Sequence, residues 1–173
     1  ETANLAINGA MIQMISHGLI SSALFLCIGV MYDRLHTRKI SDYGGVITVM
    51  PKFGALMVFF ALSNAALPGT SGFVGEFIII LASFKINAWI ATMAATTLVI
   101  GAFYTLWMVK RVIFGSVVNN KINSLKEINF IESLPLCVLA LSILALGLWP
   151  NPLFDLMFNS INVLSELILS KAS

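Results

Sequence analysis

Four long apolar runs, separated by short polar segments, dominate the chain. They cover approximately residues 5–32, 53–84, 88–109 and 131–149. A membrane-spanning helix needs about 20 apolar residues to cross a hydrocarbon core of roughly 30 Å, so each run predicts a span. Trp107, followed by Lys110 and Arg111, marks the end of the third run. Aromatic and basic residues at such a position are typical anchors at a membrane interface.

The second run is longer than one span requires and contains residues that disrupt helices. Those residues are Pro68, Gly69, Gly72 and Gly75. Proline lacks a backbone donor and the glycines relax the backbone, so we expect a break that leaves main-chain carbonyls and amides free. Non-helical backbone at membrane depth is tolerated only inside protein or against a watery cavity. The pattern therefore predicts a discontinuous second span.

The last segment has a different periodicity. Pro150-Asn151-Pro152 ends the fourth run, and beyond it apolar residues recur at three- and four-residue spacing. Asp155, Asn159, Asn162 and Glu166 occupy much of the other side. This pattern predicts an amphipathic helix over about residues 153–169 that lies at the membrane interface. Burial of the same helix against neighbouring helices is the alternative.

Composition supports an integral membrane protein. Of the 173 residues, 58% are apolar and only 10% are charged, against about 25% charged in an ordinary soluble domain. The predicted fold class is all-α: one membrane domain over residues 1–173, a polytopic transmembrane helix bundle with four spans and a C-terminal interfacial amphipathic helix. The net charge of +2, without a basic stripe interleaved with aromatic residues, indicates no nucleic-acid partner. The chain begins with Glu1 rather than Met, so we expect it to be the C-terminal part of a longer protein.

Lysine and arginine residues are distributed unequally between the two sides of the predicted bundle. The connections after the first and third spans hold Arg34, Arg38, Lys39, Lys52, Lys110, Arg111, Lys121 and Lys126, whereas the other side holds Lys85 and Lys171. Alternate connections share a side, so this bias supports four crossings. The positive-inside rule then predicts that the basic loops face the cytoplasm or the mitochondrial matrix.

Two ionisable residues, Glu76 and His17, lie at predicted membrane depth. Glu76 lies roughly 13 Å from the boundary at Lys85, at 1.5 Å per residue. A carboxylate there costs on the order of 3 kcal/mol on insertion scales, and such residues often mark an ion or proton path. A histidine titrates near neutrality, which suits a proton relay. The structural alternatives are a neutral Glu76 bonded to the broken backbone and a His17 that only links two helices.

The sequence offers few ligands for a metal or a cofactor. His36 lies in a charged loop, so His17 alone could ligate haem at membrane depth, with a second ligand from a partner. Cys27 and Cys137 lie in apolar runs without CxxC or Cys/His spacing, which indicates small core residues. The glycines after Pro68 lie inside an apolar span, which favours a helix break over a phosphate site. We therefore expect no metal site, no bound cofactor and no catalytic nucleophile in this chain.

Several separated motifs occur together in one order. They are the stretch from Gly9 to Leu19, the run from Ser21 to Leu26, Tyr32-Asp33-Arg34 with Thr37-Arg38, Tyr43-Gly44-Gly45, Leu67-Pro68-Gly69-Thr70 and Phe73-Val74-Gly75-Glu76-Phe77. In these motifs the chain closely resembles the chain M, or subunit 4, family of antiporter-like, proton-pumping subunits of respiratory complex I, the NADH-quinone oxidoreductase. The resemblance is dense from about residue 5 to 115 and thinner afterwards.

The resemblance implies that the chain corresponds to the last four of the family's fourteen spans, including a discontinuous helix. It implies that His17 lies on the central hydrophilic axis and that Glu76 is the terminal carboxylate of the half-channel that opens to the outside. Related antiporter-like subunits usually have lysine at the position of Glu76, so glutamate favours chain M. The first half-channel has no counterpart here, so this chain should not pump by itself.

The resemblance also implies a setting and a function. The expected partners are neighbouring membrane subunits of complex I, the missing N-terminal half of the same subunit and the lipid of a bacterial or mitochondrial inner membrane. NADH, FMN, iron–sulfur clusters and quinone would bind in other subunits, so redox catalysis would belong to the assembly. The hypothesis is a fragment that supplies the exit half of a proton path coupled to NADH oxidation. The alternatives are a subunit of a multi-subunit sodium/proton antiporter or membrane-bound hydrogenase, and a structural remnant without transport activity.

Overall fold

The computed structural model describes residues 2–117 and 119–172, and this part of the chain contains helices, turns and loops but no strands. The helices are α1 (Thr2–Leu35), α2 (Pro51–Asn64), α3 (Ser71–Ile86), α4 (Ala88–Val112), α5 (Phe130–Leu148) and α6 (Asn151–Ala172), with short 3-10 helices η1 (Ile40–Asp42), η2 (Val46–Thr48) and η3 (Asn120–Ser124). The prediction of an all-α fold is confirmed.

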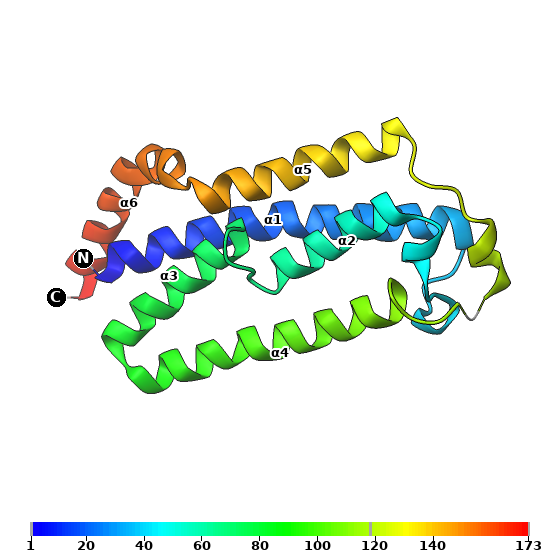
Figure 1. Ribbon diagram of the computed structural model, residues 1–173. Coiled ribbons are helices and arrows are strands. Elements are labelled where there is room, and N and C mark those ends of the chain that lie inside the picture. Colours follow the sequence, from blue (N-terminus) through cyan, green and yellow to red (C-terminus); the bar gives the residue numbers. More distant parts are fainter. Residues whose placement is uncertain (1, 118, 173) are drawn as a thin grey trace.

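The bundle contains three or four candidate membrane crossings. Helices α1, α4 and α5 are each long and apolar enough to cross a membrane. Helices α2 and α3 follow one another along the bundle beside α1 and α4, so that together they match the length of one crossing (Figure 1). With 14 and 16 residues, each is shorter than the about 20 residues that a span requires. The predicted discontinuous second span is therefore the α2–α3 pair.

Residues 65–70 form the interruption between α2 and α3. Helix α2 ends in a Schellman motif, in which Leu67 N donates to Leu62 O at 3.0 Å and Ala66 N donates to Ser63 O at 3.2 Å. Ala66 has a φ of +56°, in the left-handed region that this motif requires and that glycine usually occupies. The end of α2 is thus closed by its own backbone.

Pro68 and Gly69 lie inside the interruption, and Gly69 has a φ of +93°. Thr70 is buried and bonds back to the Leu67 carbonyl through both its amide at 3.1 Å and its hydroxyl at 2.7 Å. Gly147 of α5 packs directly on this turn, since a Cβ placed there would be 2.5 Å from Thr70 Cα. Several main-chain groups that we expected to be free are therefore bonded locally, because unpaired backbone is costly at this depth.

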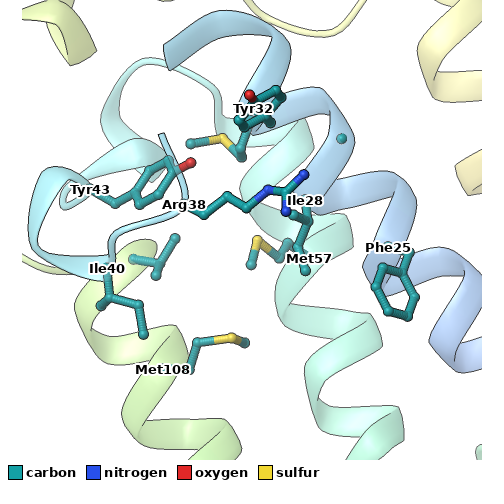
Figure 2. Close-up of a pocket in the computed structure, with 11 residues that line it drawn as sticks. Phe25, Ile28, Tyr32, Arg38, Ile40, Tyr43, Met57 and Met108 are labelled. Atoms are coloured by element: carbon teal, nitrogen blue, oxygen red, sulfur yellow. The ribbon is translucent and has the colours of Figure 1, made fainter. Parts of the chain in front are cut away.

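The connections after α1 and α4 lie together at the end of the bundle opposite to both termini (Figure 1). The chain bends by 116° between residues 40–48 and α2, so this segment folds over the bundle end. A groove of about 550 Å³ lies beneath it, lined mainly by apolar side chains such as Phe25, Met57 and Met108, with Arg38 reaching into it (Figure 2). All eight basic residues expected on one side belong to these connections or to the adjoining helix ends.

Polar contacts join α1 to the start of α5, and join the connection after α4 to α2. Arg34 at the end of α1 makes a two-pronged ion pair with Glu132 at the start of α5, with both N···O distances at 2.8 Å. Glu127 accepts from the backbone amides of Lys52 and Phe53 at 2.8 and 3.2 Å. This carboxylate satisfies donors in the first turn of α2, where the helix dipole favours negative charge.

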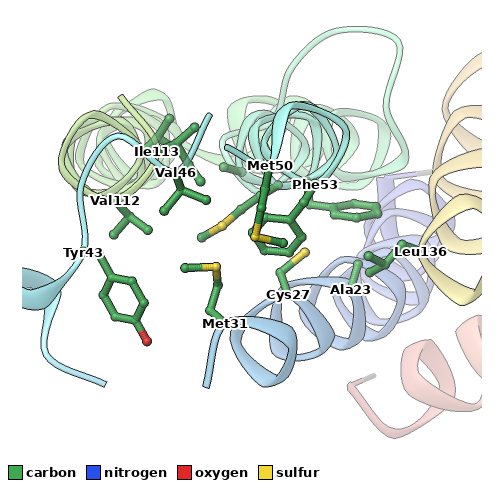
Figure 3. Close-up of a cluster of buried hydrophobic side chains, with 14 of the residues drawn as sticks. Ala23, Cys27, Met31, Tyr43, Val46, Met50, Phe53, Val112, Ile113 and Leu136 are labelled. Atoms are coloured by element: carbon green, nitrogen blue, oxygen red, sulfur yellow. The ribbon is translucent and has the colours of Figure 1, made fainter. Parts of the chain in front are cut away.

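The larger of the two buried hydrophobic clusters includes residues of the segment before α2 (Figure 3). Its members come from α1, α2, α5, the end of α4 and the segment before α2, and they include Cys27, Met31, Val46, Met50, Phe53, Ile113 and Leu136. Cys27 and Phe53 have no exposed surface, which agrees with the expected role of Cys27 as a small core residue. Cys137, in contrast, is exposed.

Helix α6 crosses the end of the bundle where both termini lie (Figure 1). Met157 and Ile161 pack against Ile12 of α1, and Asn4 Nδ2 donates to Asn162 Oδ1 at 2.9 Å. Its crosswise orientation agrees with the predicted interfacial helix. One side of α6 is nevertheless occupied by packing on α1, so features of both alternatives occur together.

Candidate functional site

Glu76 lies on α3, on the side that faces α1. Its side chain is half-buried, and Oε1 accepts a hydrogen bond from Gln13 Nε2 of α1 at 3.1 Å. It is the only hydrogen bond of the Glu76 carboxyl within the described ranges. The carboxyl is therefore held inside the bundle by a neutral amide and not by a cation.

Gly75 sets the distance between α1 and α3 at this point. A Cβ on Gly75 would be 2.5 Å from Gln13 Oε1 and 2.8 Å from both Gln13 Cα and Gln13 N. A Cβ on Gly72, three residues earlier, would be 2.6 Å from Ser63 O near the end of α2 and 3.1 Å from Ile20 of α1. Both glycines were expected to contribute to the helix break, but they lie inside α3. Their structural effect is close helix approach, which small residues permit in membrane bundles.

The α1–α3 interface contains polar groups without partners. Gln13 Oε1, Ser16 Oγ and Ser71 Oγ are buried and have no hydrogen-bond partner among the described residues. Buried polar groups are normally paired, and each exception calls for an explanation. Three such groups on facing helices distinguish this interface from the larger hydrophobic cluster.

His17 lies one turn after Gln13 on α1, so the two side chains share a helix face. Ser21 Oγ lies 3.2 Å from His17 Nε2 and 3.3 Å from Nδ1. His17 and Glu76 line the same cavity of about 260 Å³, together with Asn64 of α2 and Tyr104 of α4. The structure thus brings the two ionisable residues predicted from the sequence to one polar cavity beside the interruption.

Glu76 also reaches two other cavities along the α3–α4 contact. One, of about 240 Å³, includes Gln13 and Thr97, and the other, of about 410 Å³, is mostly apolar. The Glu76 carboxyl therefore borders three cavities in the described structure. The cavity shared with His17 is roomy enough for several water molecules, each of which takes about 30 Å³.

The polar cavity contains an imidazole and a carboxyl, two groups that can each accept and release a proton. In the described part of the chain, no three His, Cys, Asp or Glu side chains gather in a way that could hold a metal ion. The larger groove of Figure 2 is apolar and includes neither Glu76 nor His17. Its Arg38 lies over the Tyr32 ring at 5.0 Å. The polar cavity is therefore the better candidate site.

Sequence reasoning missed the neutral polar residues of this site. Gln13, Asn64, Thr97 and Tyr104 line the cavities with Glu76 or His17, but none had been assigned a role. For Gln13 a signal was present, because an amide four residues before His17 must share its helix face. No such signal existed for α2 and α4, whose facing residues depend on how the helices pack.

Comparisons with known proteins agree with this geometry. A family model described as "NADH:quinone oxidoreductase/Mrp antiporter, TM" matches residues 2–101, a range that includes Gln13, His17, the interruption and Glu76. The chain is 43% identical over 155 residues to NADH-quinone oxidoreductase subunit M of Rhodobacter capsulatus, covering 90% of this chain and 30% of that protein. It is 46% identical over 163 residues to NADH-ubiquinone oxidoreductase chain 4 of Chondrus crispus, covering 94% of this chain and 33% of that protein.

A solved structure shows the same arrangement of helices. A chain of respiratory complex I from Thermus thermophilus with bound NADH superimposes with a TM-score of 0.80 at 26% sequence identity. The match covers 86% of the present chain and 31% of that chain. The present chain therefore spans about a third of the length of the relatives it matches.

Proposed function

Because this chain belongs to the NADH:quinone oxidoreductase/Mrp antiporter transmembrane family, we propose that it supplies the exit half of a proton path in respiratory complex I. The family assignment agrees with the resemblance found in the sequence. The chain is a membrane protein, and its relatives are named as complex I subunits. Since it spans only about a third of those relatives, pumping is proposed for the complete subunit within its complex.

One observation carries the proposal: His17 and Glu76 border the same polar cavity next to an interrupted helix. His17 receives a proton from the interior of the full subunit and passes it, through the cavity, to the Glu76 carboxyl. Glu76 then releases the proton towards the outside when its surroundings favour the carboxylate. An imidazole can accept and return a proton without moving, and a buried carboxyl changes its proton affinity with nearby charge.

The interruption supports this role physically. A continuous helix at this depth would have all its backbone groups paired internally and would offer no polar surface. Here α3 begins in mid-bundle, so its first turn and the buried Ser71 and Thr70 lie near the bundle centre. Glu76 lies within two turns of that beginning. The break therefore places polar groups, including the Ser71 hydroxyl that has no partner among the described residues, in a region that is otherwise apolar.

We propose further that electron transfer occurs elsewhere in the assembly. NADH, FMN, iron–sulfur clusters and quinone would bind to other subunits, and the free energy of quinone reduction would reach Glu76 through the membrane subunits. The partners would be neighbouring antiporter-like subunits, the remaining part of this subunit and the surrounding lipid. The membrane would be the bacterial or mitochondrial inner membrane, with the basic end of the bundle on the cytoplasmic or matrix side.

The family description also includes Mrp antiporters, which keeps a sodium/proton antiporter subunit as a second candidate. Glutamate at position 76 favours the complex I subunit. Co-purification of the chain with an NADH-oxidising complex would support the first candidate. Co-purification with an antiporter complex that lacks NADH oxidation would support the second. A structural remnant would join either assembly without any effect of Glu76 on transport.

Glu76→Gln in the complete subunit of the assembled complex tests the proposal. The neutral amide keeps the size of the side chain but cannot carry a proton, so proton translocation per NADH oxidised should fall while the complex remains assembled. Glu166→Gln, the same change on the exposed side of α6, is the matched control and should leave translocation unchanged. Unchanged translocation in Glu76→Gln would remove Glu76 from the path.

A further inference from the structure

Gln13 is the direct hydrogen-bond partner of Glu76, and only one half of its amide is used. Nε2 donates to Glu76 Oε1 at 3.1 Å, while Oε1 is buried without a partner among the described residues. We propose that Gln13 positions the Glu76 carboxyl in both of its protonation states, by donating to the carboxylate and accepting from the protonated acid. This inference rests on the proposed function of Glu76.

The amide group suits this task because it contains a donor and an acceptor on one carbon. A carboxylate can only accept hydrogen bonds, whereas a protonated carboxyl has an O–H to donate. A half-turn about the last side-chain torsion exchanges Nε2 and Oε1 without moving the rest of Gln13. The proton enters and leaves on Glu76 alone, and Gln13 neither gains nor loses one. Gln13 is thus a positioning residue.

Other polar side chains lie near Glu76, but among the described residues only Gln13 forms a hydrogen bond with its carboxyl. His17 of α1, Asn64 of α2, and Thr97 and Tyr104 of α4 line the neighbouring cavities, and within the described ranges no lysine or arginine lines any cavity that Glu76 borders. None of these side chains makes a hydrogen bond to the Glu76 carboxyl in the described structure. The orientation of the carboxyl in this structure therefore depends on one amide.

Gly75 provides the space in which that amide lies. A Cβ at position 75 would be 2.5 Å from Gln13 Oε1, much closer than an ordinary contact, which begins at 3.4 Å. Because the same Cβ would be 2.8 Å from Gln13 Cα and N, the helix cannot yield without separating from α1. Gly75→Ala should therefore disturb the amide even though Gln13 itself is retained.

Infrared difference spectroscopy of the assembled complex, with proton translocation per NADH oxidised as the second readout, tests this inference. The C=O band of protonated Glu76 is identified by its loss in Glu76→Gln. Gln13→Met keeps the length of the side chain but removes both hydrogen-bonding atoms, so the band should move to higher frequency as the acid loses its partner. Loss of one hydrogen bond to a charged group corresponds to about a tenfold loss of the correctly oriented carboxylate. Translocation should therefore fall towards the Glu76→Gln value.

Two further variants keep the test decisive. Gln13→Asn retains the amide but withdraws it by one methylene, so it should give the same band shift if Gln13→Met does not assemble. Asn8→Leu removes an amide from the same helix away from Glu76 and should change neither readout. An unmoved band and normal translocation in the Gln13 variants, with translocation lost in Glu76→Gln, would overturn the inference and leave the proposed function intact. No effect of Glu76→Gln would instead refute the proposed function.

Discussion

Replacing Gly147 by alanine would force α5 away from the interruption between α2 and α3. The added Cβ would lie 2.5 Å from Thr70 Cα and would overlap the Gly69 carbonyl oxygen, whereas ordinary contacts begin at 3.4 Å. Both partners are backbone, so the two segments would have to separate by about 1 Å. Overpacking typically costs about 1–3 kcal/mol, and the higher helix propensity of alanine offsets up to about 1 kcal/mol of this. We expect a net loss of about 1–2 kcal/mol in the local stability of the interruption.

Hydrogen exchange of residues 65–72 in the assembled complex measures this loss. A loss of about 1–2 kcal/mol corresponds to amide exchange that is roughly 5–30 times faster, as long as exchange follows the local opening equilibrium. Gly29→Ala is the matched control, because a Cβ on Gly29 would meet nothing within 4 Å. Equal exchange rates in Gly147→Ala, Gly29→Ala and the unmodified protein would refute the view that α5 holds the interruption closed.

Three other predictions concern local features of the fold. Ala66→Gly should stabilise the end of α2 by about 1 kcal/mol, because residue 66 has a φ of +56°, and slower exchange of the following amide would show it. Arg34→Lys should cost about 1–2 kcal/mol by losing the two-pronged contact with Glu132, and a double-mutant cycle with Glu132→Gln in thermal unfolding would measure the coupling. The Thr37 hydroxyl donates to Asp42 and holds the pKa of that carboxyl below its usual value. The stabilisation it gives is therefore present above the unfolded pKa and lost as pH falls through the lowered native pKa. Thr37→Val should weaken this acid dependence in a pH titration of a probe on the loop, while Ser41 and Lys39 maintain the remainder.

Hydrophobic runs and helix-breaking residues were sufficient to predict most of the fold. Each predicted range overlaps an observed helix or, for 53–84, the α2–α3 pair. The run lengths reflect the thickness of the bilayer, which is a constraint that acts on sequence directly. Interruption length is not constrained in this way. Gly72 and Gly75 lie within α3, where Gly72 approaches the end of α2 and Gly75 approaches α1, and packing partners cannot be read from one segment alone.

For the candidate site, the sequence predicted the ionisable residues but not their neighbours. Glu76 and His17 stand out because charge is rare and expensive in apolar runs. Gln13 carries no charge, so its contact with Glu76 depends on the relative rotation of α1 and α3. The two-pronged contact between Arg34 and Glu132 was likewise hidden, because 98 positions separate the two residues in the chain.

The lengths of α1 and α5 have a consequence for the way the two helices cross a membrane. With 34 residues, α1 is about 51 Å long, whereas the 19 residues of α5 extend only about 29 Å. Only α5 matches the thickness of a typical hydrocarbon core, so α1 must tilt or emerge beyond it, and α6 packs on the N-terminal turns of α1 beyond the end of α5. These two neighbouring crossings therefore differ in height, and α6 covers the part of α1 that extends past α5.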